Sequence, residues 1–258
     1  MRCAFAVMVA GSIGLAASAA SAQQFGNLTA KFVVSGKAPT PTKLVINKDE
    51  AFCGKHKLVD ESIVVGKDGE LANVVVFLAP AIGQKVPANP ALTKALPAEV
   101  KLDNANCRFE PHVLVMTTEQ TLVIGNKDPV GHNSKADLFN NPAFNVLIPA
   151  GGSVKQKIEK AERIPAGVSC SIHPWMRAYM VVRDNPYTGV SDKDGALKIE
   201  GVPVGEWAFT VWHETGYVKG QQKGKDLGWK KGKVTVKIAA GKDTDLGTIE
   251  VPADSFKK

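Results

Sequence analysis

Long apolar runs and helical periodicity are the features that this sequence most clearly lacks. Beyond the first residues, no segment offers the roughly 18 consecutive apolar residues that a membrane-spanning helix needs. Amphipathic periodicity of useful helical length is also nearly absent. The sequence therefore predicts neither a membrane span nor a mainly helical fold.

Several signatures of function are missing as well. No Gly-rich phosphate-binding loop and no paired-carboxylate site stands out among the 258 residues. The net charge is +7, but the lysine-rich run from Lys219 to Lys233 lies among glycines, without an aromatic platform or a recognition helix. This pattern indicates a solvated loop rather than a nucleic-acid surface, while the positive charge would suit an acidic partner protein.

The N-terminal segment predicts export. Arg2 precedes an apolar stretch from Ala4 to Ala17, and Ala20-Ser21-Ala22 has the small-x-small pattern of a cleavage site. We interpret residues 1–22 as a secretory signal peptide, whose apolar run is too short to span a bilayer well. Cys3 lies too early for a lipid anchor. We therefore expect a mature protein that is soluble and periplasmic or secreted.

Cysteine is scarce, and its number is informative. Without residues 1–22 the chain has Cys53, Cys107 and Cys170, and an odd cysteine in an exported protein indicates intermolecular pairing or a thiol committed to metal or chemistry. Cys53 with His56 and Cys107 with His112 make two Cys/His pairs that could hold a tetrahedral metal. An oxidising compartment favours a Cys53–Cys107 disulfide instead, with both histidines as ordinary surface or strand-end residues.

The densest group of metal-binding residues is the heptapeptide C-S-I-H-P-W-M. Cys170, His173 and Met176 place a thiolate, an imidazole and a thioether on one short loop. Type 1 copper is held by two His and one Cys, with a weak axial Met, so a second imidazole must come from elsewhere. His132 is the best candidate. The alternative, in which Cys170 and Met176 fill a core and His173 occupies a turn, stays open at this point.

The rest of the sequence predicts strands. Runs rich in β-branched and aromatic residues alternate with Gly, Pro, Asn and Asp turns, so we expect an all-β protein of the sandwich type. One short helix is expected at Pro90–Leu96, and His213, at the end of a strand-like run, is expected to be structural. The predicted strands are Leu28–Val34, Ser62–Val65, Asn73–Leu78, His112–Thr117, Gln120–Ile124, Ser153–Ile158, Ala178–Val182, Trp207–Trp212 and Lys233–Ile238.

Residues 101–184 resemble a cupredoxin. The CxxHxxM loop has the short spacing of the amicyanin type, and His132-Asn133 resembles the upstream His-Asn of the family. The segment departs from the family at Gly131, where many cupredoxins have Pro, and at Ser134-Lys135-Ala136, which replaces a common apolar strand. The resemblance implies a Greek-key β-sandwich that holds one type 1 copper ion.

The same resemblance implies roles for individual residues. The copper ligands would be His132, Cys170, His173 and Met176. In the family the loop histidine reaches the surface through an apolar patch, which here would include Trp175 and give the electron a short exit. The alternative is that Trp175 is simply a core residue.

The flanking segments resemble a transthyretin-like, carboxypeptidase-regulatory sandwich. Asp192–Ile199 and Gly201–Val211 look like its second half, with a counterpart in Leu28–Ser35 and Gly69–Leu78. The resemblance implies one sandwich made of residues 23–100 and 185–258, with the cupredoxin inserted and a Cys53–Cys107 disulfide joining the two. Loss of a native disulfide typically costs about 2–5 kcal/mol. The whole arrangement resembles exported bacterial proteins described as methylamine-utilisation-like.

The leading hypothesis is an exported type 1 copper protein that transfers single electrons between periplasmic redox partner proteins and is not an enzyme. Multicopper oxidases and copper nitrite reductases need further histidine-rich centres, yet this chain has five His and no H-x-H pair. A Cys170–His173 nucleophile is also considered, but Cys170 and His173 lie on one tight loop and the spacing implies no orienting Asn or Asp. Two alternatives remain. One is a copper delivery or sensing protein, although Met-rich and His-rich tracts are absent, and the other is a cell-surface binding module with a secondary copper site.

Overall fold

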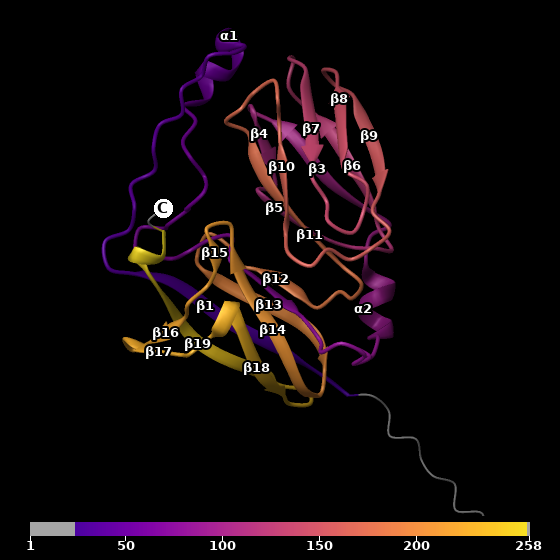
Figure 1. Cartoon of the computed structure of the whole chain (residues 1–258), viewed down its shortest axis with the longest axis vertical. Helices are drawn as coiled ribbons and strands as arrows, with labels where there is room; N and C mark the ends of the chain where they lie inside the picture. The colour runs from indigo at the N-terminus through magenta and orange to yellow at the C-terminus, as the bar shows by residue number, and fades with distance from the viewer. Residues whose placement is uncertain (1–23, 257–258) are drawn as a thin grey trace, which may run out of the picture.

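The fold is all-β, as the sequence predicts. The computed structural model describes residues 24–256, so the predicted signal peptide at residues 1–22 lies outside the described residues. Within this range the chain forms two β-sandwiches, one above the other in Figure 1, and only short helices. No helix of residues 24–256 is long and apolar enough to cross a membrane.

The first sandwich is built from both ends of the described chain. One sheet has the order β13-β1-β19-β16-β17, and the other has the order β12-β2-β14-β15, with β18 pairing with β14. Side chains of both sheets, among them Phe32 and Phe209, form one buried cluster between them. The strands are β1 (Phe25–Ser35), β2 (Val75–Leu78), β12 (Thr188–Val190), β13 (Ala196–Pro203), β14 (Gly205–His213), β15 (Gly216–Tyr217), β16 (Gln221–Gln222), β17 (Lys225–Asp226), β18 (Lys233–Ile238) and β19 (Asp243–Pro252).

The second sandwich is continuous in sequence and lies between β2 and β12. Its sheets have the orders β5-β11-β10-β7-β8 and β4-β3-β6-β9, with parallel pairs β5–β11 and β3–β6. Its own buried cluster includes Leu102, Phe109, Cys170 and Met176. The strands are β3 (Glu99–Ala105), β4 (Arg108–Glu110), β5 (Val113–Thr117), β6 (Thr121–Asn126), β7 (His132–Ala136), β8 (Phe144–Ile148), β9 (Ser153–Lys157), β10 (Ala166–Ser169) and β11 (Arg177–Arg183).

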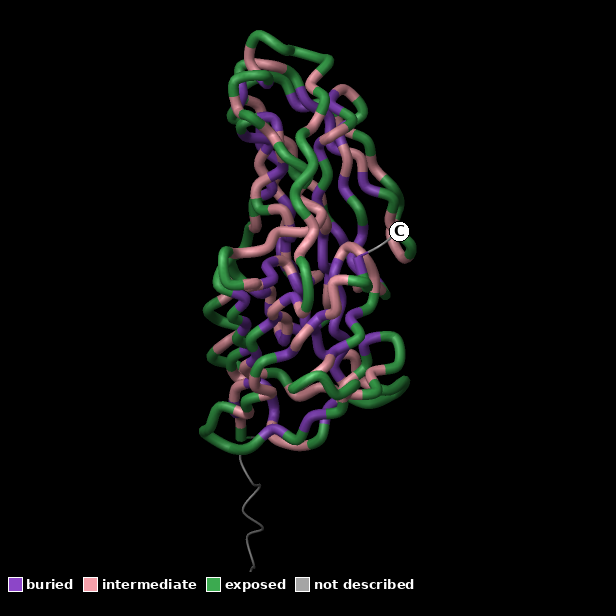
Figure 2. The backbone as a smooth tube through the Cα atoms, turned by 90° about the vertical axis from the view of Figure 1, so that its left-hand side faces the viewer, coloured by how far each residue is buried: buried purple, intermediate pink, exposed green. Residues whose placement is uncertain are grey.

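The two sandwiches share an apolar contact. Phe77 of β2 and Trp212 of β14 belong to the same buried cluster as Val113 and Val181 of the second sandwich. The Arg183 guanidinium lies over the Phe77 ring, 4.7 Å from its centroid, and donates to the Leu78 carbonyl. A buried interior runs from one sandwich into the other in Figure 2. The sandwiches therefore pack as one body along this line.

One predicted strand is wrong, whereas the short helix is confirmed as α2 (Pro90–Ala95). Ser62–Val65 is not a strand, because only Val65 makes an isolated bridge, to Leu71. The polar residues after Asn133 do form a strand, β7, since it is paired on both sides, with β8 and β10. Pairing with two neighbours overrides the weak strand propensity of these residues.

A long excursion between β1 and β2, residues 37–65, crosses from the first sandwich to the far end of the second. We call it the strap (Figure 1). Its two legs run side by side, with Lys43 bridged to Val59. At its tip lie α1 (Glu50–Cys53) and the 3-10 turn Gly54–His56. The predicted disulfide between Cys53 and Cys107 is confirmed and fastens this tip to the turn between β3 and β4.

Candidate metal centre

Two loops of the second sandwich converge at the tip of the strap. His132 opens β7, and the heptapeptide Cys170–Met176 connects β10 to β11. β7 and β10 are antiparallel neighbours, with Lys135 opposite Ser169, so the start of β7 and the end of β10 meet at one edge. The ligand atoms of His132, Cys170 and His173 accordingly lie within 4.8 Å of one another, and all three residues are buried.

The heptapeptide is held in a closed turn by its own backbone and by Asn133. The Met176 N–H donates to the His173 carbonyl at 2.9 Å, and the Cys170 N–H donates to the Met176 carbonyl at 3.3 Å. Asn133 Oδ1 accepts from the N–H groups of Ser171 (2.7 Å) and Ile172 (3.1 Å). The Cys170 thiol also lies 3.4 Å from this oxygen. Sequence reasoning used Asn133 only as part of a motif, whereas it is the acceptor that orders the loop.

Both histidines are oriented by a carboxylate. His132 Nε2 lies 2.9 Å from Asp128 Oδ2, and His173 Nε2 lies 2.7 Å from Asp49 Oδ2. A carboxylate accepts the Nε2 hydrogen, so the Nδ1 atom of each ring is left with its lone pair free for a metal. His173 Nδ1 lies 3.7 Å from Cys170 Sγ. His132 Nδ1 is buried and has no hydrogen-bond partner among the described residues.

The electrostatics of His132 favour the neutral ring. Burial lowers the pKa of His132, and the hydrogen bond that the ring donates to Asp128 opposes this shift in part. A neutral imidazole is the form that binds metal, because a protonated ring has no lone pair to donate. The ring is thus both aligned and in the correct protonation state near neutral pH.

The residues present fit a type 1 copper ion. Two imidazole nitrogens and one cysteine sulfur converge in a buried site, and this donor set, with the sulfur as a thiolate, is the one that such copper prefers. The unpartnered Nδ1 of His132 would gain a ligand bond there. Met176, the predicted axial ligand, is 1% exposed and belongs to the same buried cluster as Cys170.

A second group of donors does not make another metal site. Cys107, Asp128 and His132 also lie close together, but the Cys107 sulfur is bonded to Cys53. Asp128 instead accepts from the N–H groups of Asn106 and Cys107, at 2.6 and 2.8 Å. The alternative prediction, a tetrahedral metal site formed by the two Cys/His pairs, is wrong for the same reason, because both cysteine sulfurs form the disulfide.

The loop histidine does not reach the surface. His173 has no exposed area, because the strap covers it and Asp49 occupies its Nε2 side. Trp175 is only partly buried, its ring centroid lies 5.1 Å from that of His173, and its Nε1–H donates to the Cys107 carbonyl at 3.1 Å. The prediction of an exposed histidine was wrong because the strap comes from outside the cupredoxin-like segment.

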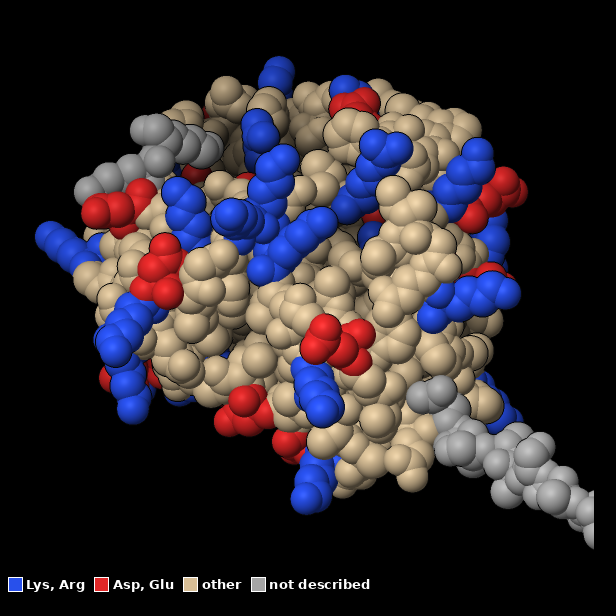
Figure 3. All heavy atoms as spheres, turned by 60° about the horizontal axis from the view of Figure 1, so that its bottom comes forward, with Lys and Arg blue, Asp and Glu red and all other residues tan. Residues whose placement is uncertain are grey.

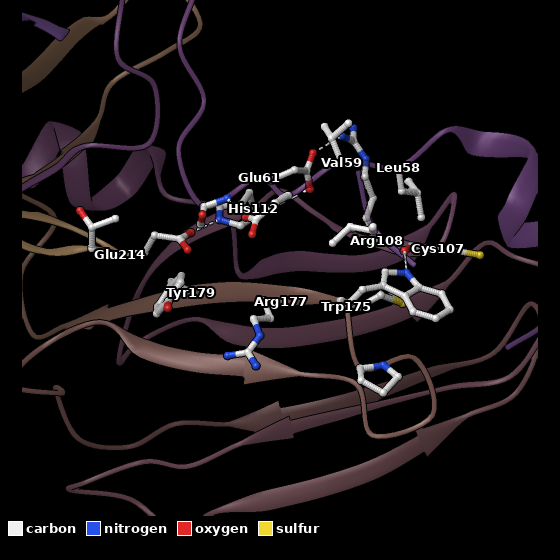
Figure 4. Close-up of a pocket in the computed structure, with 16 residues that line it drawn as sticks. Leu58, Val59, Glu61, Cys107, Arg108, His112, Trp175, Arg177, Tyr179 and Glu214 are labelled. Carbon is white, nitrogen blue, oxygen red and sulfur yellow. Dashed lines mark hydrogen bonds and ion pairs between the residues drawn. The ribbon is translucent and has the colours of Figure 1, made fainter. Parts of the chain in front are cut away.

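A cavity of about 390 Å³ lies beside the loop (Figure 4). Trp175 and Met176 form part of its wall, which the strap and the first sandwich complete. His112 lines it too and pairs with Glu214 of the first sandwich. His112 is therefore no ordinary surface residue: its side chain is 11% exposed and bridges the two sandwiches. Its partner lies 102 residues further on, beyond the reach of local sequence patterns.

The remaining two histidines belong to neither group of possible metal ligands among the described residues. His213 is 2% exposed and its Nδ1 lies 2.9 Å from Thr215 Oγ1, in agreement with a structural role. Burial is the largest cause that lowers the pKa of His213, to about 4. His56, in the strap, packs edge-on against Phe52.

Comparison with known proteins yields structural neighbours only. No protein-family model matches the chain, and no curated protein matches its sequence. A copper-containing nitrite reductase from Thermus scotoductus SA-01 is 22% identical over 38% of this chain and 27% of its own, with a TM-score of 0.32. A mutant of amicyanin in its oxidized state is 19% identical over 35% of this chain and 88% of its own, with a TM-score of 0.31.

A purple cupredoxin from Nitrosopumilus maritimus is 23% identical over 33% of this chain and 99% of its own, with a TM-score of 0.28. The chain thus spans about a quarter of the nitrite reductase and nearly all of the purple cupredoxin. These structural neighbours are cupredoxins, matched over part of the chain.

Proposed function

We propose that this protein is an exported type 1 copper protein that transfers single electrons between redox partners in the periplasm. The observation that carries the proposal is the Nδ1 atom of His132, which is buried, unpartnered and beside Cys170 and His173. Copper bound by such donors supplies a reversible one-electron couple. The export part of the proposal rests on the sequence of residues 1–22.

The chain contributes a rigid, dry set of donors. His132 and His173 would bind through Nδ1, Cys170 through its thiolate and Met176 through its thioether. Each of these residues is at most 2% exposed, and Asn133 fixes the backbone around the thiol. A donor set held in place this way changes little in geometry when charge changes, which supports electron transfer. It leaves no open position for a substrate, so we propose no enzymatic role.

The burial of the centre also supports retention of the metal. A delivery protein must load and release its cargo, whereas the strap closes the side of His173 that family resemblance placed at the surface. Electron transfer is therefore favoured over delivery or sensing. A cell-surface binding role for the first sandwich stays a separate hypothesis, which no contact described above favours.

We propose that the partner approaches at the cavity rather than at His173. Trp175 contacts the His173 ring and lines the cavity, so it is a group through which the covered centre comes close to solvent. The partner proposed from the sequence is an acidic redox protein, on the basis of the net charge of +7. Lys and Arg side chains spread over the first sandwich, with Asp and Glu among them (Figure 3). Such a distribution would steer a partner by long-range attraction more than it would define a contact.

The test is a titration of the purified mature protein with cupric ion. An intense visible absorption from the copper–thiolate bond is expected, and Cys170→Ser should abolish it. His56→Gln removes a histidine outside the centre and should leave the band intact. A wild-type protein that stays colourless and binds no copper would refute the proposal.

A further inference from the structure

The strap delivers a carboxylate to the centre from a segment that no local motif connects with it. Asp49 lies directly before α1, with φ 45° and ψ 40°, a left-handed conformation that is uncommon for residues other than glycine. Its carbonyl accepts from the N–H groups of Phe52 and Cys53, at 2.9 and 2.8 Å. This conformation is held by those bonds and directs the side chain to His173 Nε2, 2.7 Å away.

A second carboxylate supports the other histidine. Asp128 is 4% exposed, and its Oδ2 lies 2.9 Å from His132 Nε2. The same carboxylate accepts from the backbone N–H groups of Asn106 and Cys107. Its position is therefore tied to the turn between β3 and β4.

The disulfide connects these two supports. Cys53 is four residues after Asp49, and its backbone N–H donates a hydrogen bond to the Asp49 carbonyl. The backbone N–H of Cys107 donates a hydrogen bond to the Asp128 carboxylate. The Cys53–Cys107 bond thus joins the turn that carries Asp49 to the turn that holds Asp128. The Cys107 carbonyl also accepts from Trp175 of the heptapeptide. The disulfide therefore joins the two segments whose carboxylates, Asp49 and Asp128, contact the histidines, and one of these segments also contacts the heptapeptide.

We infer that Asp49 is a positioning residue for His173, and that the Cys53–Cys107 disulfide holds Asp49 and Asp128 as a linked pair of supports for the two imidazoles. The strap is then a working part of the metal centre rather than a cover alone. A carboxylate that accepts the outer N–H of a histidine ligand fixes its tautomer, and loss of such a partner typically weakens metal binding about 10–100-fold. The inference rests on the proposed function only for the identity of the metal.

The first experiment reads the ring itself in the copper-free protein. Nitrogen NMR of the histidine rings should show His173 with hydrogen on Nε2 in the wild type. Asp49→Ala should give a mixture of the two tautomers, and Asp49→Asn should restore the Nε2–H form, because an amide oxygen can also accept. Glu50→Ala removes an exposed carboxylate from the next residue and is the matched control. An unchanged His173 tautomer in Asp49→Ala would overturn the inference.

The second experiment measures cupric affinity by competition with a chelator. We expect Asp49→Ala to weaken binding about 10–100-fold and Glu50→Ala to leave it unchanged. A Cys53→Ala/Cys107→Ala variant should weaken binding as well, and Asp49→Ala should then add less than about threefold, because the strap is already released. Full additivity of the two effects would overturn the link through the disulfide.

Two controls distinguish misfolding of a variant and absence of copper binding from failure of the inference about Asp49. Circular dichroism checks that the disulfide-free variant folds, and if it does not, Cys53→Ser/Cys107→Ser, whose two hydroxyl groups can still form a hydrogen bond, takes its place. A wild type that binds no copper would refute the proposed function, while the NMR experiment on the copper-free protein would still decide the role of Asp49.

Discussion

The Nε2 atom of His173 lies 2.7 Å from the Oδ2 atom of Asp49, a residue 124 positions earlier in the chain. This contact removes the loop histidine from the surface and gives it a fixed hydrogen-bond partner. It also makes the strap, which belongs to the first sandwich by connectivity, part of the wall of the candidate centre in the second. The predictions below follow from this arrangement and from the burial around it.

Replacement of Asn133 by Ala should destabilise the loop. The change removes an acceptor shared by the Ser171 and Ile172 N–H groups, and unmet donors of this kind cost about 1–3 kcal/mol. Chemical denaturation should show this loss together with weaker cupric binding. Asn145→Ala removes one acceptor of the Asn133 side-chain amide, leaves the Asn133 oxygen in place and should have a smaller effect. Equal effects of the two variants would contradict the role given to Asn133.

Replacement of Met176 by Leu should preserve the fold and the thiolate absorption. Leu has nearly the volume of Met, and such exchanges in a core usually cost less than about 1.5 kcal/mol. If Met176 is the weak axial ligand, the reduction potential of the copper-loaded variant should shift, as voltammetry would show. Met116→Leu, in the same buried cluster, is the control and should leave the potential unchanged. A potential unaffected by Met176→Leu would assign Met176 to packing alone.

Stability should fall on acidification through the titration of His213. Its pKa is lowered to about 4 in the folded protein, so the unfolded chain binds the proton first as the pH falls. The contribution of His213 to the free energy of unfolding is fully present above about pH 6.5 and is lost progressively down to about pH 4. The total loss is at most roughly 3 kcal/mol. Urea denaturation of wild type and His213→Gln across this range should show a shallower slope in the variant. Parallel slopes would show that other groups carry the acid sensitivity.

Trp175 should matter for electron exchange more than for metal binding. Trp175→Leu removes the ring that contacts His173 and lines the cavity, but none of the four proposed ligands. Stopped-flow reduction of the copper-loaded protein by ferrocyanide should slow severalfold, with cupric affinity little changed. Phe139→Leu alters a side chain that is 71% exposed elsewhere on the same sandwich and serves as the control. An unchanged rate in Trp175→Leu would show that the partner approaches by another side.

Much of the local structure was predictable because it is encoded in neighbouring residues. Alternating apolar residues identified strands such as β1 and β14, and the short helix expected at Pro90–Leu96 is α2. β7 was harder to predict, since its polar side chains are buried by pairing on both edges. The prediction of a strand at Ser62–Val65 was wrong for the converse reason, because these residues are strand-like in type but have no neighbouring strand to pair with.

By itself the sequence determined the strand-rich character of this protein, the spacing of Cys170, His173 and Met176, and the presence of two cysteines free to form the disulfide. These features depend on residue type and short-range spacing. Tertiary structure alone decided that Asp49 and Asp128 support the two histidines and that His173 is buried. The physical reason is that hydrogen bonds and burial depend on which distant segments pack together, and the strap acquires its role only when the disulfide fastens it to the second sandwich.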